Sequence, residues 1–212
     1  MEKLLAYFAE NQGEILLALK QHIVLSGVAV LLGLAISLCI CIISSMKQIN
    51  IDRLINFFSF LRLIPGVALL VVAMPIMGTG AFPALCTLTL LTIPSILINT
   101  YAGIKNIPPA TIESAISLGL ENRQILFRIQ LPIAVPFIIL GVRTAVVDAV
   151  TVATIAALMG AGGLGRYVMT GLVINNMTLV LIGSILITIM AFGSEAILGI
   201  VQKHLEHKYT GR

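Results

Sequence analysis

The sequence predicts an all-α membrane protein with about five membrane-spanning helices. Of its 212 residues, 58% are hydrophobic and only 10% are charged, whereas soluble domains have about 45–50% apolar and about 25% charged residues. The apolar residues form long runs, and a helix needs about 20 of them to cross the hydrocarbon core of a bilayer. The runs lack the strict apolar–polar alternation of outer-membrane strands, which argues against a barrel.

Five apolar segments are long enough to span a membrane. The second contains Pro65 and Pro75 and the third contains Pro94, so both are open to kinks or breaks. No basic region or small-residue cleavage site accompanies the first segment, and we expect it to remain in the mature protein. An amphipathic segment around residues 4–19 would lie at the membrane interface. The predicted spans cover about residues 23–44, 54–77, 83–104, 133–159 and 178–201 of a single domain, residues 1–212.

The basic residues orient these spans. Eight of them fall in the first loop, the third loop and the C-terminal segment: Lys47, Arg53, Lys105, Arg123, Arg128, Lys203, Lys208 and Arg212. Only Lys3, Lys20 and Arg166 fall on the opposite side. The positive-inside rule therefore predicts an outside N-terminus, a cytoplasmic C-terminus and a cytoplasmic loop over residues 105–132. Because the basic residues form no stripe, the net charge of +4 does not indicate a nucleic-acid partner.

The loop over residues 105–132 is the one sizeable polar segment between spans. Pro108-Pro109 suits a turn followed by a first helical position, and Thr111 is a plausible N-cap. Gly119 interrupts the helical pattern, which then resumes with apolar and polar residues on opposite faces. We expect two short helices joined at Gly119 and closed by Pro132, with exposed apolar residues that favour a partner.

The same loop resembles the EAA loop of ABC importer permeases. That family pattern is Glu-Ala-Ala, three residues, Gly, nine residues and Ile-x-Leu-Pro, and only Ser114 departs from it. The alternative is an ordinary amphipathic hairpin at the membrane interface. The matching positions are Glu113, Ser114, Ala115, Gly119, Ile129, Leu131 and Pro132.

This resemblance implies that the loop couples the chain to a separate ATPase. The hairpin would dock into a groove on the ATPase, with Glu113 as a polar anchor, Gly119 as the bend and Pro132 as the stop. The chain itself would bind no cofactor, and its partner subunit would use ATP. The implied partners are an ATPase dimer, a second permease chain that is a copy or a paralogue, an extracellular solute-binding protein and membrane lipid.

Two further segments resemble the corresponding segments of permeases for glycine betaine, carnitine or choline. One is residues 99–104, Asn-Thr-Tyr-Ala-Gly-Ile, and the other is residues 160–165, Gly-Ala-Gly-Gly-Leu-Gly. Methionine-type permeases share the glycine-rich segment and a similar length, so they remain an alternative. The glycine-rich segment is not a phosphate-binding loop, because Arg166 and Tyr167 follow where Gly-Lys-Ser/Thr is required.

Charged residues at membrane depth are costly and therefore point to function. Arg143 and Asp148 lie near the middle of the fourth span, and helical periodicity places Asp148 on one face with Thr144, Thr151 and Thr154. We hypothesise that this face lines a translocation pathway and that the carboxylate suits a cationic head group. Alternatively, Asp148 pairs with Arg143 or Arg62 for packing alone.

Two other charges lie within predicted spans. Arg62 could help to form a gate at a helix break, but we expect it to snorkel to the interface or to pair. Glu195 is expected to be paired or interfacial.

The cysteine and histidine residues suggest no metal site. The cysteines lie in apolar runs and are expected to be buried; they are Cys39, Cys41 and Cys86. The three histidines, His22, His204 and His207, are expected to be solvated. A secondary transporter would explain the intramembrane charges but not the loop motif. A membrane enzyme is disfavoured because the sequence holds no paired carboxylates or nucleophile constellation.

Overall fold

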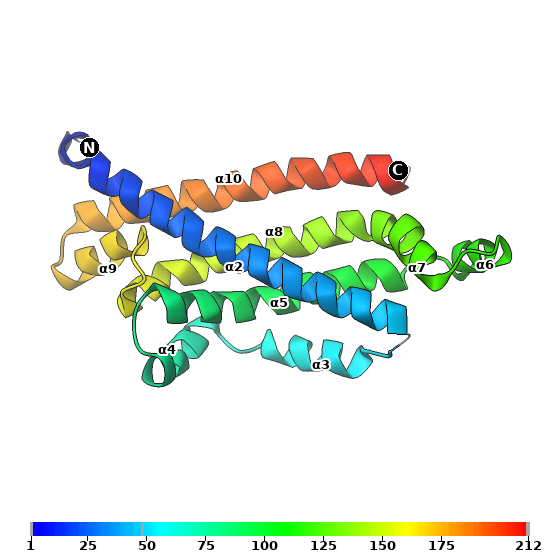
Figure 1. Cartoon of the computed structure of the whole chain (residues 1–212). Coiled ribbons are helices and arrows are strands. Elements are labelled where there is room, and N and C mark those ends of the chain that lie inside the picture. The colour runs from blue at the N-terminus through cyan, green and yellow to red at the C-terminus, as the bar shows by residue number, and fades with distance from the viewer. Residues whose placement is uncertain (1, 48, 211–212) are drawn as a thin grey trace.

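The computed structural model describes residues 2–47 and 49–210, and every regular element there is a helix. Figure 1 shows an elongated bundle with a short helical hairpin, α6 and α7, projecting from one end. The elements are α1 (Glu2–Glu10), α2 (Gln12–Lys47), α3 (Asp52–Leu61), α4 (Gly66–Met77), α5 (Ala81–Lys105), α6 (Pro109–Ser117), α7 (Asn122–Ile125), the π-helical turn η1 (Leu126–Gln130), α8 (Leu131–Ala156), the 3-10 turn η2 (Ala157–Met159), α9 (Gly165–Val173) and α10 (Met177–Thr210).

Four helical runs are long and apolar enough to cross a membrane, and a bent pair makes a fifth. The four are α2, α5, the continuous run from Asn122 to Met159, and α10. The all-α fold with about five spans is therefore confirmed. Helix α2 is longer than expected, since it begins at Gln12 and takes in the second half of the segment predicted to lie at the interface.

The predicted second span is broken rather than straight. Helices α3 and α4 meet at an angle of 89° across residues 62–65. Pro65 precedes the first residue of α4, and a proline removes a backbone donor and drives the residue before it out of helical conformation. The chain therefore turns sharply next to Arg62.

Pro132 does not stop the second helix of the hairpin, which corrects the sequence prediction. The helix runs on from Asn122 to Met159. The turn before Pro132 is π-helical, with the Leu131 N–H donating to the Leu126 carbonyl. Such a widened turn changes the hydrogen-bond ladder just where a proline ring would otherwise clash with the preceding turn.

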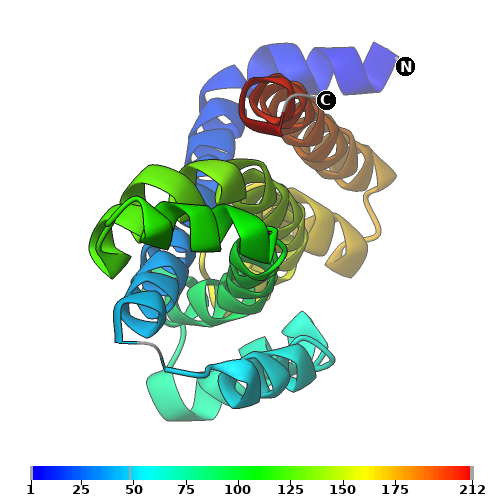
Figure 2. The same ribbon diagram turned by 90° about the vertical axis from the view of Figure 1, so that its right-hand side faces the viewer.

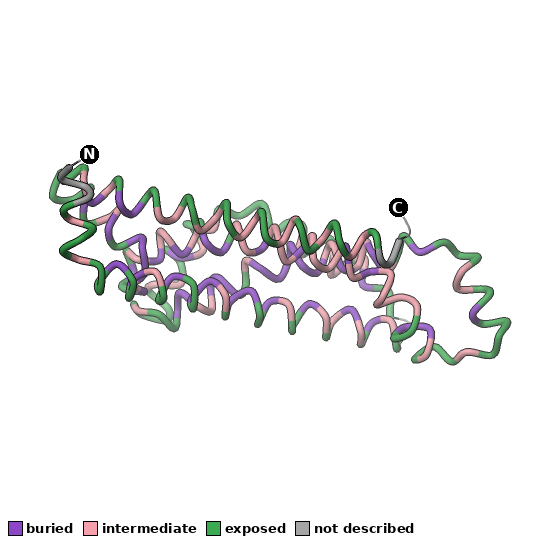
Figure 3. The backbone as a smooth tube through the Cα atoms, turned by 90° about the horizontal axis from the view of Figure 1, so that it is seen from above, coloured by how far each residue is buried: buried purple, intermediate pink, exposed green. Residues whose placement is uncertain are grey.

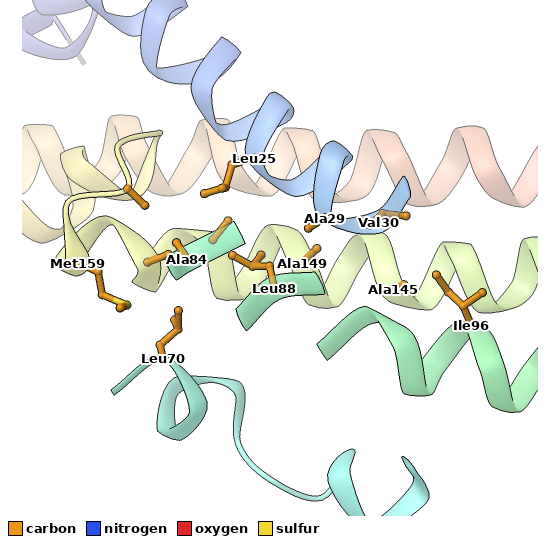
Figure 4. Packing of buried hydrophobic residues seen from close by; sticks show 13 residues of the cluster. Leu25, Ala29, Val30, Leu70, Ala84, Leu88, Ile96, Ala145, Ala149 and Met159 are labelled. Atoms are coloured by element: carbon orange, nitrogen blue, oxygen red, sulfur yellow. The ribbon is translucent and has the colours of Figure 1, made fainter. Parts of the chain in front are cut away.

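Helix α5 lies at the centre of the bundle, between α2 on one side and α8 on the other. Figure 2 shows α10 and the α3–α4 pair at opposite edges, with α5 and α8 between them. Figure 3 shows that burial is concentrated along the inner sides of the long helices, while the hairpin is mostly exposed. The central core cluster, part of which Figure 4 labels, joins α2, α4, α5 and α8 through Leu25, Ala29, Val30, Leu70, Ala84, Leu88, Ile96, Ala145, Ala149, Ala153, Ala156, Met159 and Ala161.

Small residues let these helices approach closely. A Cβ atom added to Gly141 of α8 would lie 2.9 Å from the Ile96 Cα and 3.0 Å from the Ser95 carbonyl oxygen of α5. A Cβ atom on Gly33 of α2 would meet the Thr92 side chain of α5. Lipid tails are as apolar as leucine, so membrane helices associate largely through such close packing.

Replacing Gly141 with alanine should therefore force α5 and α8 apart. We expect a loss of about 1–3 kcal/mol of stability, the usual effect of overpacking against backbone that cannot move aside. Thermal unfolding of the detergent-purified protein measures it. Gly27→Ala is the matched control, because a Cβ atom there meets nothing within 4 Å. Equal unfolding temperatures for the two variants would contradict the close α5–α8 contact.

Candidate functional site

The hairpin formed by α6 and α7 bends at Gly119. Gly119 has a φ of +78°, in the left-handed region that glycine enters without strain. The Leu120 N–H donates to the Ala115 carbonyl at 3.2 Å and closes the end of α6. Helix α7 then begins with a capping box in which Glu121 and Gln124 satisfy each other's backbone N–H groups. The bend between the two helices is thus locally fixed.

Two details of the hairpin differ from the sequence expectation. Thr111 is not the N-cap, because α6 already begins at Pro109. The capping side chains belong to the second helix instead, and the pattern Glu121-x-x-Gln124 is the signal that could have located them.

The hairpin residues that match the EAA pattern lie partly on its surface and partly at its base. Glu113, Ser114 and Gly119 are exposed, whereas Ala115 is buried. Ile129, Leu131 and Pro132 are half-buried where the hairpin enters α8. At the tip, Leu118 is 82% exposed and Ile116 is also exposed. The hairpin therefore presents apolar side chains beyond the end of the bundle.

The predicted polar face of α8 exists and is uncovered in the single chain. Asp148 and Thr151 are exposed and Thr144 is half-buried. The threonine hydroxyls donate to carbonyls of their own helix, at 3.1 Å from Thr144 to Leu140 and 2.8 Å from Thr151 to Val147. Their lone pairs remain free to accept hydrogen bonds from outside.

The carboxylate of Asp148 interacts with groups from two other parts of the chain. The Ser95 hydroxyl of α5 donates to its Oδ2 atom at 3.4 Å. Arg62, at the break between α3 and α4, attracts the carboxylate electrostatically. The carboxylate is thus hydrogen-bonded to α5, and the cation nearest in charge effect comes from the α3–α4 break.

Arg143 pairs with Glu195 of α10 and not with Asp148. Its Nε atom donates to Glu195 Oε1 at 2.6 Å, and the two groups also form an ion pair. Its Nη1 atom donates to Gln202 Oε1 at 3.1 Å, and Gln202 donates in turn to Glu206 at 2.8 Å. This ladder ties α8 to α10. The sequence predicted that Glu195 is paired or interfacial, and the structure shows it paired with Arg143.

A pocket of about 540 Å³ opens between α8 and α10 beside this ladder. It places Asp148 and the Arg143–Glu195 pair on one continuous surface. Phe192 is a lining residue that sequence reasoning missed, because a phenylalanine in an apolar span gives no signal of its own. The pocket is lined by Leu140, Arg143, Thr144, Val147, Asp148, Ala191, Phe192 and Glu195.

The glycine-rich segment lies at the opposite end of the bundle from the hairpin, packed against α2. Gly160, Gly162 and Gly163 all have positive φ angles. The Gly163 N–H donates to Gln21 Oε1 at 3.1 Å, and the neighbouring His22 is only 1% exposed, with its Nε2 atom 3.1 Å from the Val150 carbonyl. The expectation that His22 is solvated was wrong, because α2 starts early enough to turn this residue toward α8.

The cysteines and the titratable groups give no metal site among the described residues. Cys41 is buried as expected, Cys86 is half-buried and Cys39 is exposed on the outer side of α2, which corrects the prediction for that residue. In the part of the chain that the structure describes, no three His, Cys, Asp or Glu side chains gather closely enough to hold a metal ion.

Comparison with known proteins gives the family of the chain. The family described as "Binding-protein-dependent transport system inner membrane component" matches residues 30–211. The chain belongs to this family of transport permeases. The permease is 31% identical to the carnitine transport permease protein OpuCB of Listeria monocytogenes, over 98% of this chain and 95% of that protein.

A second relative and a solved structure agree with this placement. The permease is 27% identical to the glycine betaine/carnitine/choline permease OpuCB of Bacillus subtilis, over 98% of this chain and 96% of that protein. The inward-facing MetNI methionine ABC transporter contains a chain with the same fold. The TM-score is 0.78 at 20% identity, over 92% of this chain and 98% of that one.

The Arg143–Glu195 pair should stabilise the permease only as a pair. Arg143→Met and Glu195→Leu each leave one charge without its partner in an apolar bundle, and each should lower the unfolding temperature. The double variant removes both charges and should recover most of that loss. Thermal unfolding in detergent tests this, and a double variant as unstable as the two single losses combined would contradict the pairing.

Proposed function

We propose that this permease passes a small quaternary-ammonium solute, of the glycine betaine, carnitine and choline class, into the cell. It does so as the membrane subunit of an ABC importer whose separate ATPase supplies the energy. The observation that carries the proposal is the projecting hairpin, whose spacing is that of the EAA loop. The substrates named for two relatives that match almost the whole chain support the solute class.

The hairpin end of the bundle is proposed to face the cytoplasm, with the N-terminus outside. The basic residues support this orientation, since Arg53, Lys105, Arg123, Arg128 and Lys203 all lie at the hairpin end of their helices. In this orientation Glu113 and the exposed Leu118 point toward the compartment where ATP is available. The proposed partner there is an ATPase dimer. We also propose that residues 1–212 form one transmembrane domain.

A second permease chain, a copy or a paralogue, is proposed to close the pathway. Figure 2 shows α10 and the α3–α4 pair at opposite edges of the bundle, with α8 between them, and Asp148 and Thr151 of α8 are exposed in the single chain. A carboxylate facing lipid would be costly, so this face needs a protein or water-filled neighbour. We assign Thr144, Asp148 and Thr151 to that pathway, with Arg62 at its edge and Arg143 in the adjoining pocket.

Selection of the solute is proposed to occur in an extracellular binding protein. Quaternary ammonium groups are recognised by cages of aromatic rings, and this chain has no tryptophan and only 4 tyrosines. Among these, Tyr7 and Tyr167 lie near the outer end of the bundle, whereas Tyr101 lies near the hairpin end. The permease therefore passes the solute with modest affinity of its own.

A methionine-type importer and a secondary transporter are the other candidates. The likeness to the methionine transporter is one of fold, at 20% identity. Uptake that stops on ATP depletion but persists with a proton uncoupler would favour the importer over the secondary transporter. Competition by unlabelled methionine against labelled carnitine would separate the two importer types.

The hairpin tip should be required for holding the ATPase. We expect Leu118→Glu, and separately the paired change Glu113→Ala with Gly119→Val, to lower the amount of ATPase that co-purifies by about tenfold or more. Truncating a well-packed interface residue commonly costs about 2 kcal/mol or more, and about 1.4 kcal/mol is tenfold in affinity.

The matched control for this experiment is Val173→Glu. Val173 is 83% exposed, like Leu118, but lies at the opposite end of the bundle. It should co-purify the ATPase as wild type does. If the hairpin variants retain the ATPase and its coupled hydrolysis, the docking assignment is wrong.

A further inference from the structure

Arg62 stands at the one sharp break found in a candidate span of the described chain. Helix α3 ends at Leu61 and α4 begins at Gly66, with 89° between their axes. The Arg62 side chain is exposed on the same single chain that leaves Asp148 exposed. Its charge is therefore held by a turn rather than within a regular helix.

The start of α4 is pressed against α8 one turn beyond Asp148. A Cβ atom added to Gly66 would lie 2.7 Å from Val152 Cγ2. Since Val152 follows Asp148 by four residues, the start of α4 lies about one helical turn along α8 from the carboxylate. The Ser95 hydroxyl of α5 donates a hydrogen bond to the Oδ2 atom of Asp148. The second carboxylate oxygen has no hydrogen-bond donor among the described residues.

Arg62 and Asp148 attract each other without touching. Arg62 carries the charge opposite to that of Asp148, but the ion pairs formed within the described residues do not include these two. The nearby Arg143 is already neutralised by Glu195. Arg62 and Asp148 are therefore left as one cation and one anion that form no ion pair with each other or with Arg143.

We propose that these two residues form a transient binding site for a zwitterion, with its quaternary ammonium on Asp148 and its carboxylate on Arg62. This inference rests on the proposed function and names the residues that distinguish among its solutes. A guanidinium binds a carboxylate with two parallel N–H donors. A quaternary ammonium carries no N–H and needs only a nearby negative charge, which the free oxygen of Asp148 supplies.

Charge balance explains why a zwitterion fits this site better than a plain cation. A zwitterion placed between Arg62 and Asp148 leaves the local charge at zero, whereas choline adds one positive charge next to the guanidinium. Uncompensated charge is expensive at membrane depth. Arg62 thus favours glycine betaine and carnitine over choline, and Asp148 serves all three.

The test is ATP-driven uptake of labelled carnitine and choline by the assembled transporter in proteoliposomes. We expect Arg62→Gln to lower carnitine uptake by about tenfold, which corresponds to about 1.4 kcal/mol, and to leave choline uptake within about threefold of wild type. Asp148→Asn should lower uptake of both. Equal effects of Arg62→Gln on the two solutes, or no effect on either, would overturn the proposal.

Two controls separate this inference from the proposed function. Arg53→Gln removes an exposed arginine near the start of α3 and should change neither uptake. Co-purification of the ATPase with every variant reports assembly, and a wild-type complex that assembles but takes up none of these solutes would refute the solute class itself.

A charge exchange covers the case in which wild type takes up only zwitterions. Arg62→Asp combined with Asp148→Arg keeps one charge of each sign, so a zwitterion can bind in the reverse orientation. Carnitine uptake by the assembled double variant should exceed that of either single variant. An assembled double variant with no recovery would overturn the proposal.

Discussion

The close contact between α5 and α8 is the constraint on which the rest of the structure depends. Gly141 brings the α8 backbone against Ile96 and Ser95 of α5. The flank of α8 that carries Thr144, Asp148 and Thr151 borders this contact, where Ser95 donates to Asp148, and both Asp148 and Thr151 are left exposed. Packing thus decides the direction in which the polar residues point, because lipid offers helices no hydrophobic reason to associate in one orientation.

The bilayer also explains how the polar groups of α8 are satisfied. Thr144 and Thr151 donate to carbonyls of their own helix. Arg143 is bound by Glu195 and Gln202, so its charge serves the joint between α8 and α10. Asp148 and Arg62 form no ion pair among the described residues, and for this reason we propose that they act on a charged solute.

Hydropathy and spacing in the sequence were sufficient to predict the number of spans, the hairpin and its bend. Long apolar runs leave few alternatives to a spanning helix, and Gly119 is a local signal that acts within its own turn. The 89° break was not predictable, because Pro65 permits a bend without setting its angle. The π-helical turn before Pro132 was missed for a related reason, since an adjustment of the hydrogen-bond ladder leaves no mark in residue periodicity.

Contacts between distant segments account for the other differences. The burial of His22 depends on how α2 packs against α8, 128 residues away in sequence. The pairing of Arg143 with Glu195 likewise joins two helices that are separated by the glycine-rich segment and α9. A sequence shows that a charge in an apolar span needs compensation but does not show which partner supplies it.

The central claim is that the outward face of α8 lines a water-filled pathway in the assembled importer. It is tested most directly by labelling a cysteine at Thr151 with a membrane-impermeant thiol reagent, after replacing the three natural cysteines with alanine. A cysteine at Leu31, 65% exposed on α2, serves as the lipid-facing control. The account predicts that position 151 reacts, at a rate that changes when ATP binds, while position 31 does not. A cysteine at 151 that stays unreactive in every nucleotide state, or reacts no faster than the one at 31, would contradict it.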